Sequence, residues 1–121
     1  MSKIADKVHA MLTELFPPAP YERVKREIFV PYKGQKLYFD FYVKELGVYV
    51  EVQGEQHEKF VKHFHGDLSG LDAQRFRDNL KIEYVENSGK CLVRFRFNEE
   101  ITKETVNNKL LKVLEGHCLY E

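Results

Sequence analysis

Apolar residues recur along this chain with two different spacings, and each spacing predicts one kind of element. A spacing of three or four residues marks one face of a helix and predicts helices over residues 2–16, 71–86 and 103–115. Pro17, Gly89 and Gly116 follow these segments and are typical of helix ends. The predicted buried positions of the second and third helices are Ala73, Phe76, Leu80, Tyr84, Val106, Leu110, Leu111 and Leu114.

Strict alternation of apolar and polar residues predicts strands over residues 24–30 and 91–97 and a hairpin within residues 36–57. In the first hairpin strand Phe39, Phe41 and Val43 share a face, and in the second Val48, Val50 and Val52 do. The helix between the hairpin and the last strand supplies the crossover that a parallel pair needs. The predicted order is α-β-β-β-α-β-α, an α/β fold with a central mixed sheet flanked by helices.

The hairpin brings two carboxylates together. A turn centred between Glu45 and Leu46 places Asp40 directly opposite Glu51. Like charges at such positions lie about 5 Å apart and destabilise a sheet. A divalent cation with oxygen ligands would turn this repulsion into a binding site. The alternative is a solvated strand face on which two acidic residues meet by chance.

The segment Gly54-Glu55-Gln56-His57 then adds an imidazole just past the second hairpin strand. Asp, a gap of ten residues and Glu-x-Gln resemble the PD-(D/E)xK nuclease pattern, which has a restriction-endonuclease-like core of the predicted order. The stretches FDFYV, VEVQGEQH, RD…K and LVRFRF resemble more closely its very-short-patch-repair branch, which includes related phage homing endonucleases. The resemblance covers residues 27–97, most of the chain.

This resemblance implies a DNA endonuclease that hydrolyses a phosphodiester bond with Mg²⁺, for which Mn²⁺ would substitute. Asp40 and Glu51 are then the metal ligands, with the Val52 carbonyl as a third candidate. His57 is the candidate general base, because a neutral imidazole is available near pH 7. Gln53 stands where the pattern usually has Lys; it can hold a water molecule but brings no positive charge.

Two further acidic residues match the pattern. Asp78 corresponds to the last Asp of the motif and would orient His57; the alternative is an ion pair with Arg75 or Lys81 on its own helix. Glu27 is the best-placed match for an acidic residue that precedes the hairpin, with Glu22 and Glu14 as other candidates. An ion pair with a neighbouring basic residue is as good an account of Glu27.

Basic residues beyond the hairpin are candidates for contact with phosphate oxygens, where most protein–DNA hydrogen bonds go. They are Lys59, Lys62, His63 and His65, together with Arg94 in the last strand. For Arg94, pairing with an acidic neighbour is an equal alternative. For the histidines, the alternatives are a solvated loop and a zinc site completed by Asp67 with Cys91 or Cys118, for which the spacing is a weak signal.

Composition narrows these hypotheses. The length of 121 residues predicts a single domain over residues 1–121, and the 43% hydrophobic content supports a globular core. The resemblance implies that this domain is of the nuclease type. The 19 basic and 19 acidic residues balance, whereas a nucleic-acid-binding domain is commonly basic. A catalytically inactive nucleic-acid-binding module or an adaptor on the same fold is therefore the alternative to a nuclease.

The same composition bears on compartment and partners. Two cysteines make no disulfide framework, and a cytoplasmic protein is expected. The expected partner is DNA, with RNA as a second possibility. A recognition domain or partner protein and self-association are further expectations.

Overall fold

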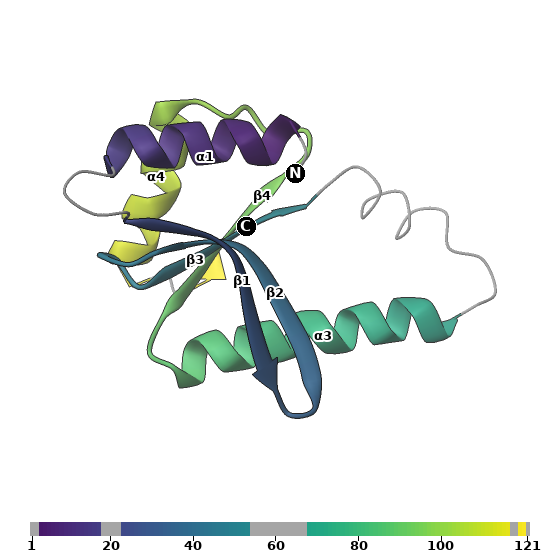
Figure 1. Cartoon of the computed structure of the whole chain (residues 1–121). Coiled ribbons are helices and arrows are strands. Elements are labelled where there is room, and N and C mark those ends of the chain that lie inside the picture. The colour runs from purple at the N-terminus through teal and green to yellow at the C-terminus, as the bar shows by residue number, and fades with distance from the viewer. Residues whose placement is uncertain (1–2, 18–22, 54–67, 117–118, 121) are drawn as a thin grey trace.

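We describe the fold from a computed structural model, in residues 3–17, 23–53, 68–116 and 119–120. In these ranges the chain forms α1 (Lys3–Leu15), β1 (Val24–Tyr32), β2 (Gln35–Val43), β3 (Val48–Gln53), α3 (Leu68–Asn87), β4 (Cys91–Arg96), α4 (Lys103–Leu114) and β5 (Leu119–Tyr120) (Figure 1). The predicted α/β class and mixed sheet are confirmed, and β5 is an additional two-residue strand at the edge.

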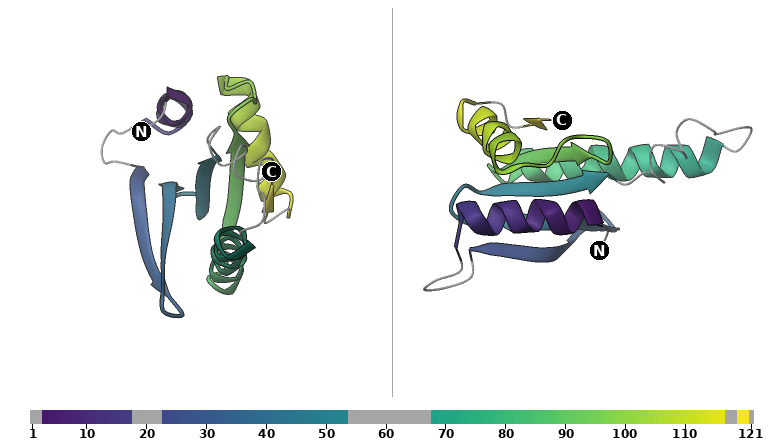
Figure 2. Two further views of the ribbon diagram at one scale, coloured as in Figure 1. Left: turned by 90° about the vertical axis from the view of Figure 1, so that its right-hand side faces the viewer. Right: turned by 90° about the horizontal axis from the view of Figure 1, so that it is seen from above.

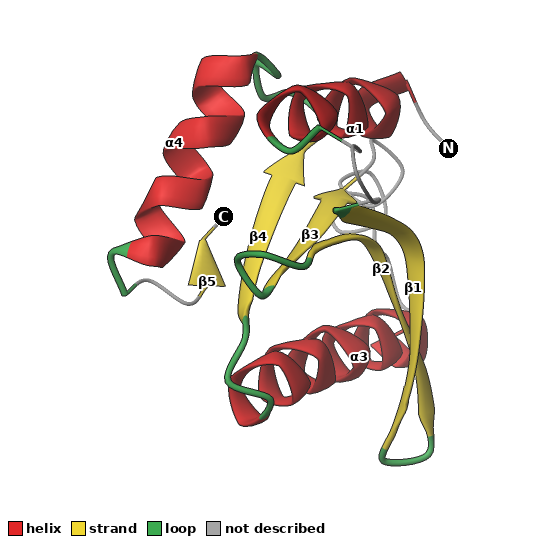
Figure 3. Ribbon diagram, turned by 60° about the vertical axis from the view of Figure 1, so that its left-hand side comes forward, coloured by secondary structure: helices red, strands yellow, loops and turns green. Residues whose placement is uncertain are grey.

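The strands form one sheet in the order β1-β2-β3-β4-β5. β1, β2 and β3 are antiparallel neighbours, whereas β4 pairs in parallel with β3 and β5 in parallel with β4. α3 lies in the connection between β3 and β4, as the parallel pair requires. α1 and α4 cover one face of the sheet, and α3 covers the other (Figures 1 and 3).

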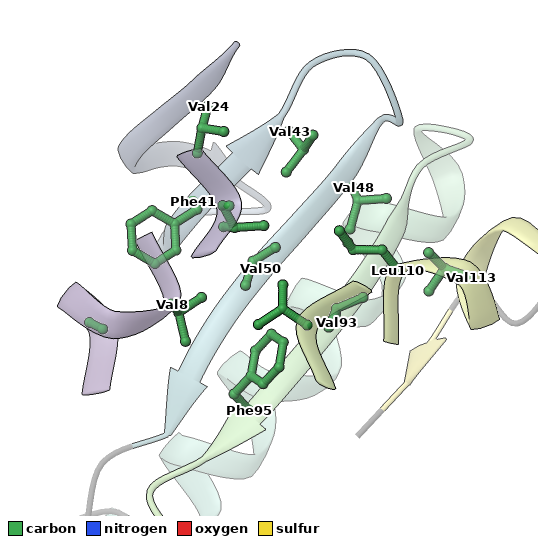
Figure 4. Packing of buried hydrophobic residues seen from close by; sticks show 13 residues of the cluster. Val8, Val24, Phe41, Val43, Val48, Val50, Val93, Phe95, Leu110 and Val113 are labelled. Atoms are coloured by element: carbon green, nitrogen blue, oxygen red, sulfur yellow. The ribbon is translucent and has the colours of Figure 1, made fainter. Parts of the chain in front are cut away.

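Two apolar cores result, one on each face. The first lies under α1 and α4 and is built largely from valines of the sheet and of the two helices, with two phenylalanines, Phe41 and Phe95 (Figure 4). The second lies under α3 and joins Leu37, Phe39 and Tyr49 to the helix. The alternation predicted for β3 is confirmed, because Val48 and Val50 enter the first core while Tyr49 enters the second.

Side chains of the β1–β2 ribbon pack into the first core at one end of the ribbon and into the second core at the other. Leu37, Phe39, Phe41 and Val43 form one buried alternating row, as predicted for the last three, but Phe41 packs in the first core and Phe39 in the second. The change coincides with Glu27, which has a positive φ of 53° inside β1. The paired register passes from Arg26–Phe41 to Ile28–Phe39 around this point. The ribbon turns there and runs on past α3 (Figures 1 and 2).

The turns follow their local sequences. Lys33 and Gly34 both have positive φ, 49° and 77°, which is the type I′ geometry preferred in two-residue hairpins. This compact turn lets β1 continue to Tyr32, two residues beyond the predicted end. Gly89, at φ 68°, closes α3 in the left-handed conformation as predicted.

The helix faces needed two corrections. Phe76 is 52% exposed and Ala73 is also exposed, because the first turns of α3 extend past the ends of the strands (Figures 1 and 2). On α4, Leu111 and Leu114 are 46% and 56% exposed. The buried face of α4 instead consists of Val106, Lys109, Leu110 and Val113.

Lys109 can occupy a buried position of α4 because its ammonium group is paired. It donates to the Arg94 carbonyl and to Glu99, and it lies 4.4 Å from the centre of the Phe95 ring. A buried charge needs such partners. Within the described residues, no helix is long and apolar enough to cross a membrane.

Candidate active site

The site begins where β2 and β3 stop pairing. Phe41 pairs with Val50, Tyr42 with Tyr49 and Val43 with Val48, and the same register continued by one step puts Asp40 opposite Glu51, as the turn predicts. At this position the hydrogen-bond partner of the β3 backbone is the side chain of Asp40 and not the backbone of β2. Its Oδ2 accepts a hydrogen bond of 2.7 Å from the Val52 backbone N–H.

A cavity of about 200 Å³ opens at this point between the two strands and α3. It has room for several water molecules, each of which takes about 30 Å³ in the liquid, or for a phosphate group. The lining residues are Tyr38, Asp40, Glu51, Val52, Gln53, Asp78 and Lys81. The structure thus brings together five of the residues predicted from the sequence: Asp40, Glu51, Val52, Gln53 and Asp78.

Glu51 is held by two cationic groups. Its Oε2 accepts a hydrogen bond of 3.0 Å from Arg94 Nε, and its Oε1 accepts one from the Lys81 ammonium. Glu51 is 7% exposed and Arg94 is 4% exposed, so each charge depends on its partner. Of the two alternatives for Arg94, the structure shows the pairing with an acidic residue; a phosphate contact would require Arg94 to leave Glu51.

The electrostatics of Asp40 differ from those of Glu51. Burial raises the pKa of the Asp40 carboxyl above its usual value, and the negative charges of Glu51 and Glu27 raise it further. The Val52 N–H and the Lys81 charge act in the opposite direction. Asp40 therefore lies in a partly desolvated, electronegative position, where an added cation would favour the ionised form.

Asp78 lines the cavity, whereas Glu27 lies near it and is not among the lining residues. Glu27 is exposed on β1 next to the ribbon turn, close enough to affect the pKa of Asp40. Its left-handed backbone conformation costs a non-glycine residue about 1–2 kcal/mol, and such strain is concentrated at functional sites. Asp78 is half-buried on α3, one turn before Lys81, whose ammonium bonds to Glu51.

Lys81 is the residue whose place in the site the sequence did not reveal. It belongs to the RD…K pattern, but the pattern assigns it no role. Asp78 and Lys81 are three residues apart, which puts them on one face of a helix. That spacing was the available signal, and only the packing of α3 against β3 turns this face toward Glu51.

Several predicted residues lie outside the described residues. They are His57, Lys59, Lys62, His63 and His65, Asp67 and Cys118 of the zinc alternative, and Glu22. Glu14, the other alternative to Glu27, is exposed on α1. Cys91 is half-buried and packs against the first core.

The described donors can be compared with what Mg²⁺ requires. Among the described residues there is no group of three or more His, Cys, Asp or Glu side chains that could hold a metal ion. The predicted ligands Asp40, Glu51 and Val52 line the cavity, together with a third carboxylate, that of Asp78. This donor set fits Mg²⁺, which commonly binds through one or two carboxylates and keeps water or phosphate oxygens as its other ligands.

Comparisons with known proteins add one relative. The chain is 31% identical over 74 residues to "Uncharacterized protein 307L" of Invertebrate iridescent virus 6. The matched segment makes up 61% of this chain and 38% of the viral protein, so the chain spans well under half of that relative. No family model and no solved structure matches the chain.

Proposed function

We propose that this protein is a metal-dependent DNA endonuclease of the very-short-patch-repair or homing type. The observation that carries the proposal is the convergence of Asp40 and Glu51 on one cavity, where β2 and β3 part. Like charges that face each other in a partly buried place cost stability unless a ligand uses them. The cavity also contains a glutamine and a lysine side chain, Gln53 and Lys81, which suit a water molecule and a phosphate.

The fold supports this proposal. The order α-β-β-β-α-β-α, followed by the short β5, agrees with the restriction-endonuclease-like core of PD-(D/E)xK nucleases. In that core the acidic residues come from the two strands of a hairpin, to which β2 and β3 would correspond. The cavity lies at these two strands, with α3 as its other wall.

In the proposed reaction Asp40, Glu51 and the Val52 carbonyl would hold Mg²⁺, which would supply charge stabilisation at the phosphoryl oxygen and at the leaving oxygen. The Val52 N–H fixes the orientation of the Asp40 carboxylate, and Arg94 fixes that of Glu51. Both ligands are therefore positioned before substrate binds, which lowers the cost of assembling the site.

The remaining residues would handle water and charge. Gln53 lines the cavity and can position the attacking water through its amide group. His57 follows β3 by four residues and is proposed to accept the proton of that water. Asp78 would orient the imidazole, and Lys81 would balance negative charge on the phosphate.

The test is nicking of supercoiled plasmid DNA in Mg²⁺ or Mn²⁺. We compare the natural protein with Asp40→Asn and His57→Ala, and use Glu83→Gln as control because Glu83 pairs with Lys33 at the surface. Metal-dependent nicking that is lost in the first two variants and kept in the control supports the proposal. Nicking that survives in Asp40→Asn contradicts it.

A catalytically inactive nucleic-acid-binding or adaptor module is the second candidate. The observation in its favour is that both carboxylate oxygens of Glu51 already have cationic partners, Lys81 and Arg94. Such a module would bind DNA or RNA with an affinity that falls with salt and is not increased by Mg²⁺. An adaptor would show neither effect. Filter binding at several salt concentrations, with and without Mg²⁺, separates these candidates from an active nuclease.

A further inference from the structure

The ammonium group of Lys81 occupies the place of a cation in the proposed metal site. It bonds to Glu51 Oε1, lines the same cavity as Asp40, and its charge acts on the Asp40 carboxyl. Its side chain is only 18% exposed, and Nζ lies 5.5 Å from the centre of the Phe39 ring. The two facing carboxylates are thus compensated by an internal cation.

We propose that Lys81 is an exchangeable counter-ion: it neutralises Glu51 in the ion-free protein, gives up Oε1 when a divalent cation binds, and then contacts the phosphate of the substrate. This inference rests on the proposed function and assigns a role to a residue outside the predicted ligand set. It makes metal binding and the release of a phosphate-binding group parts of one step.

The surroundings of Glu51 suit such an exchange. Arg94 holds the other oxygen, Oε2, from a nearly fully buried position, so Glu51 stays in place when Lys81 leaves. Lysine is a compact charge on a flexible four-carbon stem, so its ammonium can move by several ångströms without backbone movement. The cavity beside it provides the space for that movement.

The exchange also explains how the site could work with Gln53 at the position where the nuclease pattern usually has lysine. A lysine at that strand position would bring a positive charge to the cavity from β3, and Gln53 brings none. Lys81 brings the charge from α3 instead. Lys81 can thus neutralise Glu51 in the ion-free protein and bind the phosphate of the substrate in the active complex.

The first experiment measures Mn²⁺ affinity by calorimetry at constant ionic strength for the natural protein, Lys81→Met, Arg75→Met and Asp40→Asn. Arg75 is an exposed cation on the same helix and controls for net charge. An opposite charge within about 4–6 Å changes the proton affinity of a carboxylate by about 10- to 1000-fold, and Mn²⁺ competes for the same lone pairs. We therefore expect Lys81→Met to bind Mn²⁺ at least about tenfold more tightly, and Arg75→Met to bind as the natural protein does.

The second experiment measures the binding of a DNA duplex at several salt concentrations, with and without Ca²⁺, another hard cation that takes oxygen ligands. Each phosphate contact adds about 0.9 to the slope of log K against log salt. In Ca²⁺ the slope of the natural protein should exceed that of Lys81→Met by about 0.9. Without Ca²⁺ the two slopes should agree, which a purely structural lysine would not produce.

The outcomes separate this inference from the proposed function. If the natural protein binds Mn²⁺ and Lys81→Met binds it equally or less tightly, the exchange is refuted while the metal site stands. If neither binds Mn²⁺, both are refuted. Slopes that do not depend on Ca²⁺ refute the phosphate contact. Circular dichroism checks that Lys81→Met is folded, and Lys81→Gln replaces it if it is not.

Discussion

We expect Glu51→Gln and Asp40→Asn to change the free energy of unfolding in opposite directions, although each removes one negative charge from the same cavity. The difference comes from the partners of the two carboxylates. Glu51 neutralises Arg94, which is 4% exposed, whereas Asp40 accepts a backbone hydrogen bond from Val52 and has acidic neighbours.

For Glu51→Gln the structure gives a large loss. Removing one partner of a buried ion pair leaves an uncompensated charge and typically costs about 3–5 kcal/mol. The amide can still accept from Arg94 Nε, so we expect the lower end, about 3 kcal/mol. That is a large part of the roughly 5–15 kcal/mol by which such domains are stable, and it corresponds to a fall in Tm of about 10 °C.

For Asp40→Asn we expect no loss at neutral pH, and a gain that depends on pH. The pKa of Asp40 is raised above its ordinary value of 3.8, so the folded protein holds this proton to higher pH than the unfolded chain does. The stability from Asp40 is therefore fully present below about pH 3.8 and is lost as pH rises through the raised pKa. Asn does not titrate, so the free energy of unfolding of Asp40→Asn, relative to that of the natural protein, should increase between acidic and neutral pH.

The assay is urea unfolding at pH 7 and near pH 3.8 in the presence of a chelator. Glu83→Gln is the matched control, since its partner Lys33 is 57% exposed and an ion pair in solvent contributes little to stability. Equal losses of stability in Glu51→Gln and Asp40→Asn at pH 7 would refute the reasoning, because they would mean that the two carboxylates have equivalent surroundings.

Three further predictions concern the same region and the cores. In plasmid nicking, Lys81→Arg should keep more activity than Lys81→Met. Adding Gln53→Lys to Lys81→Met should restore part of the lost nicking activity; if it does not, Lys81 does not supply the charge that a lysine at position 53 would supply. Glu27→Gly should raise the free energy of unfolding by about 0.5–1 kcal/mol in urea, because the relief of a left-handed backbone exceeds the entropic cost of glycine. Phe95→Ala should cost about 3–5 kcal/mol by the same measurement, whereas Phe76→Ala should change stability by less than about 0.5 kcal/mol, because only Phe95 is buried.

Much of the architecture follows from local patterns in the sequence. Apolar periodicity gives the helices and strands to within a few residues, because a period of 2 or 3.6 produces an apolar face only in the matching conformation. The short turn between β2 and β3 determines the register of the hairpin, and this register alone brings Asp40 opposite Glu51. The central pair of the candidate site could therefore be predicted without any tertiary information.

The rest depends on how the elements meet in space. Phe76 satisfies the helical pattern but is exposed, since the pattern does not show where a helix runs beyond its sheet. Phe39 and Phe41 belong to one row but enter different cores, because the ribbon turns at Glu27.

The ion pairs of the candidate site also depend on the tertiary structure. The sequence leaves Arg94 two equal partners and offers Lys81 only Asp78 on its own helix, since the partner of a long cationic side chain is whichever anion the packing brings within reach. The fold buries Glu51 between β4 and α3, so both side chains turn to it. A buried carboxylate must be compensated, and only the tertiary structure decides which cations compensate it.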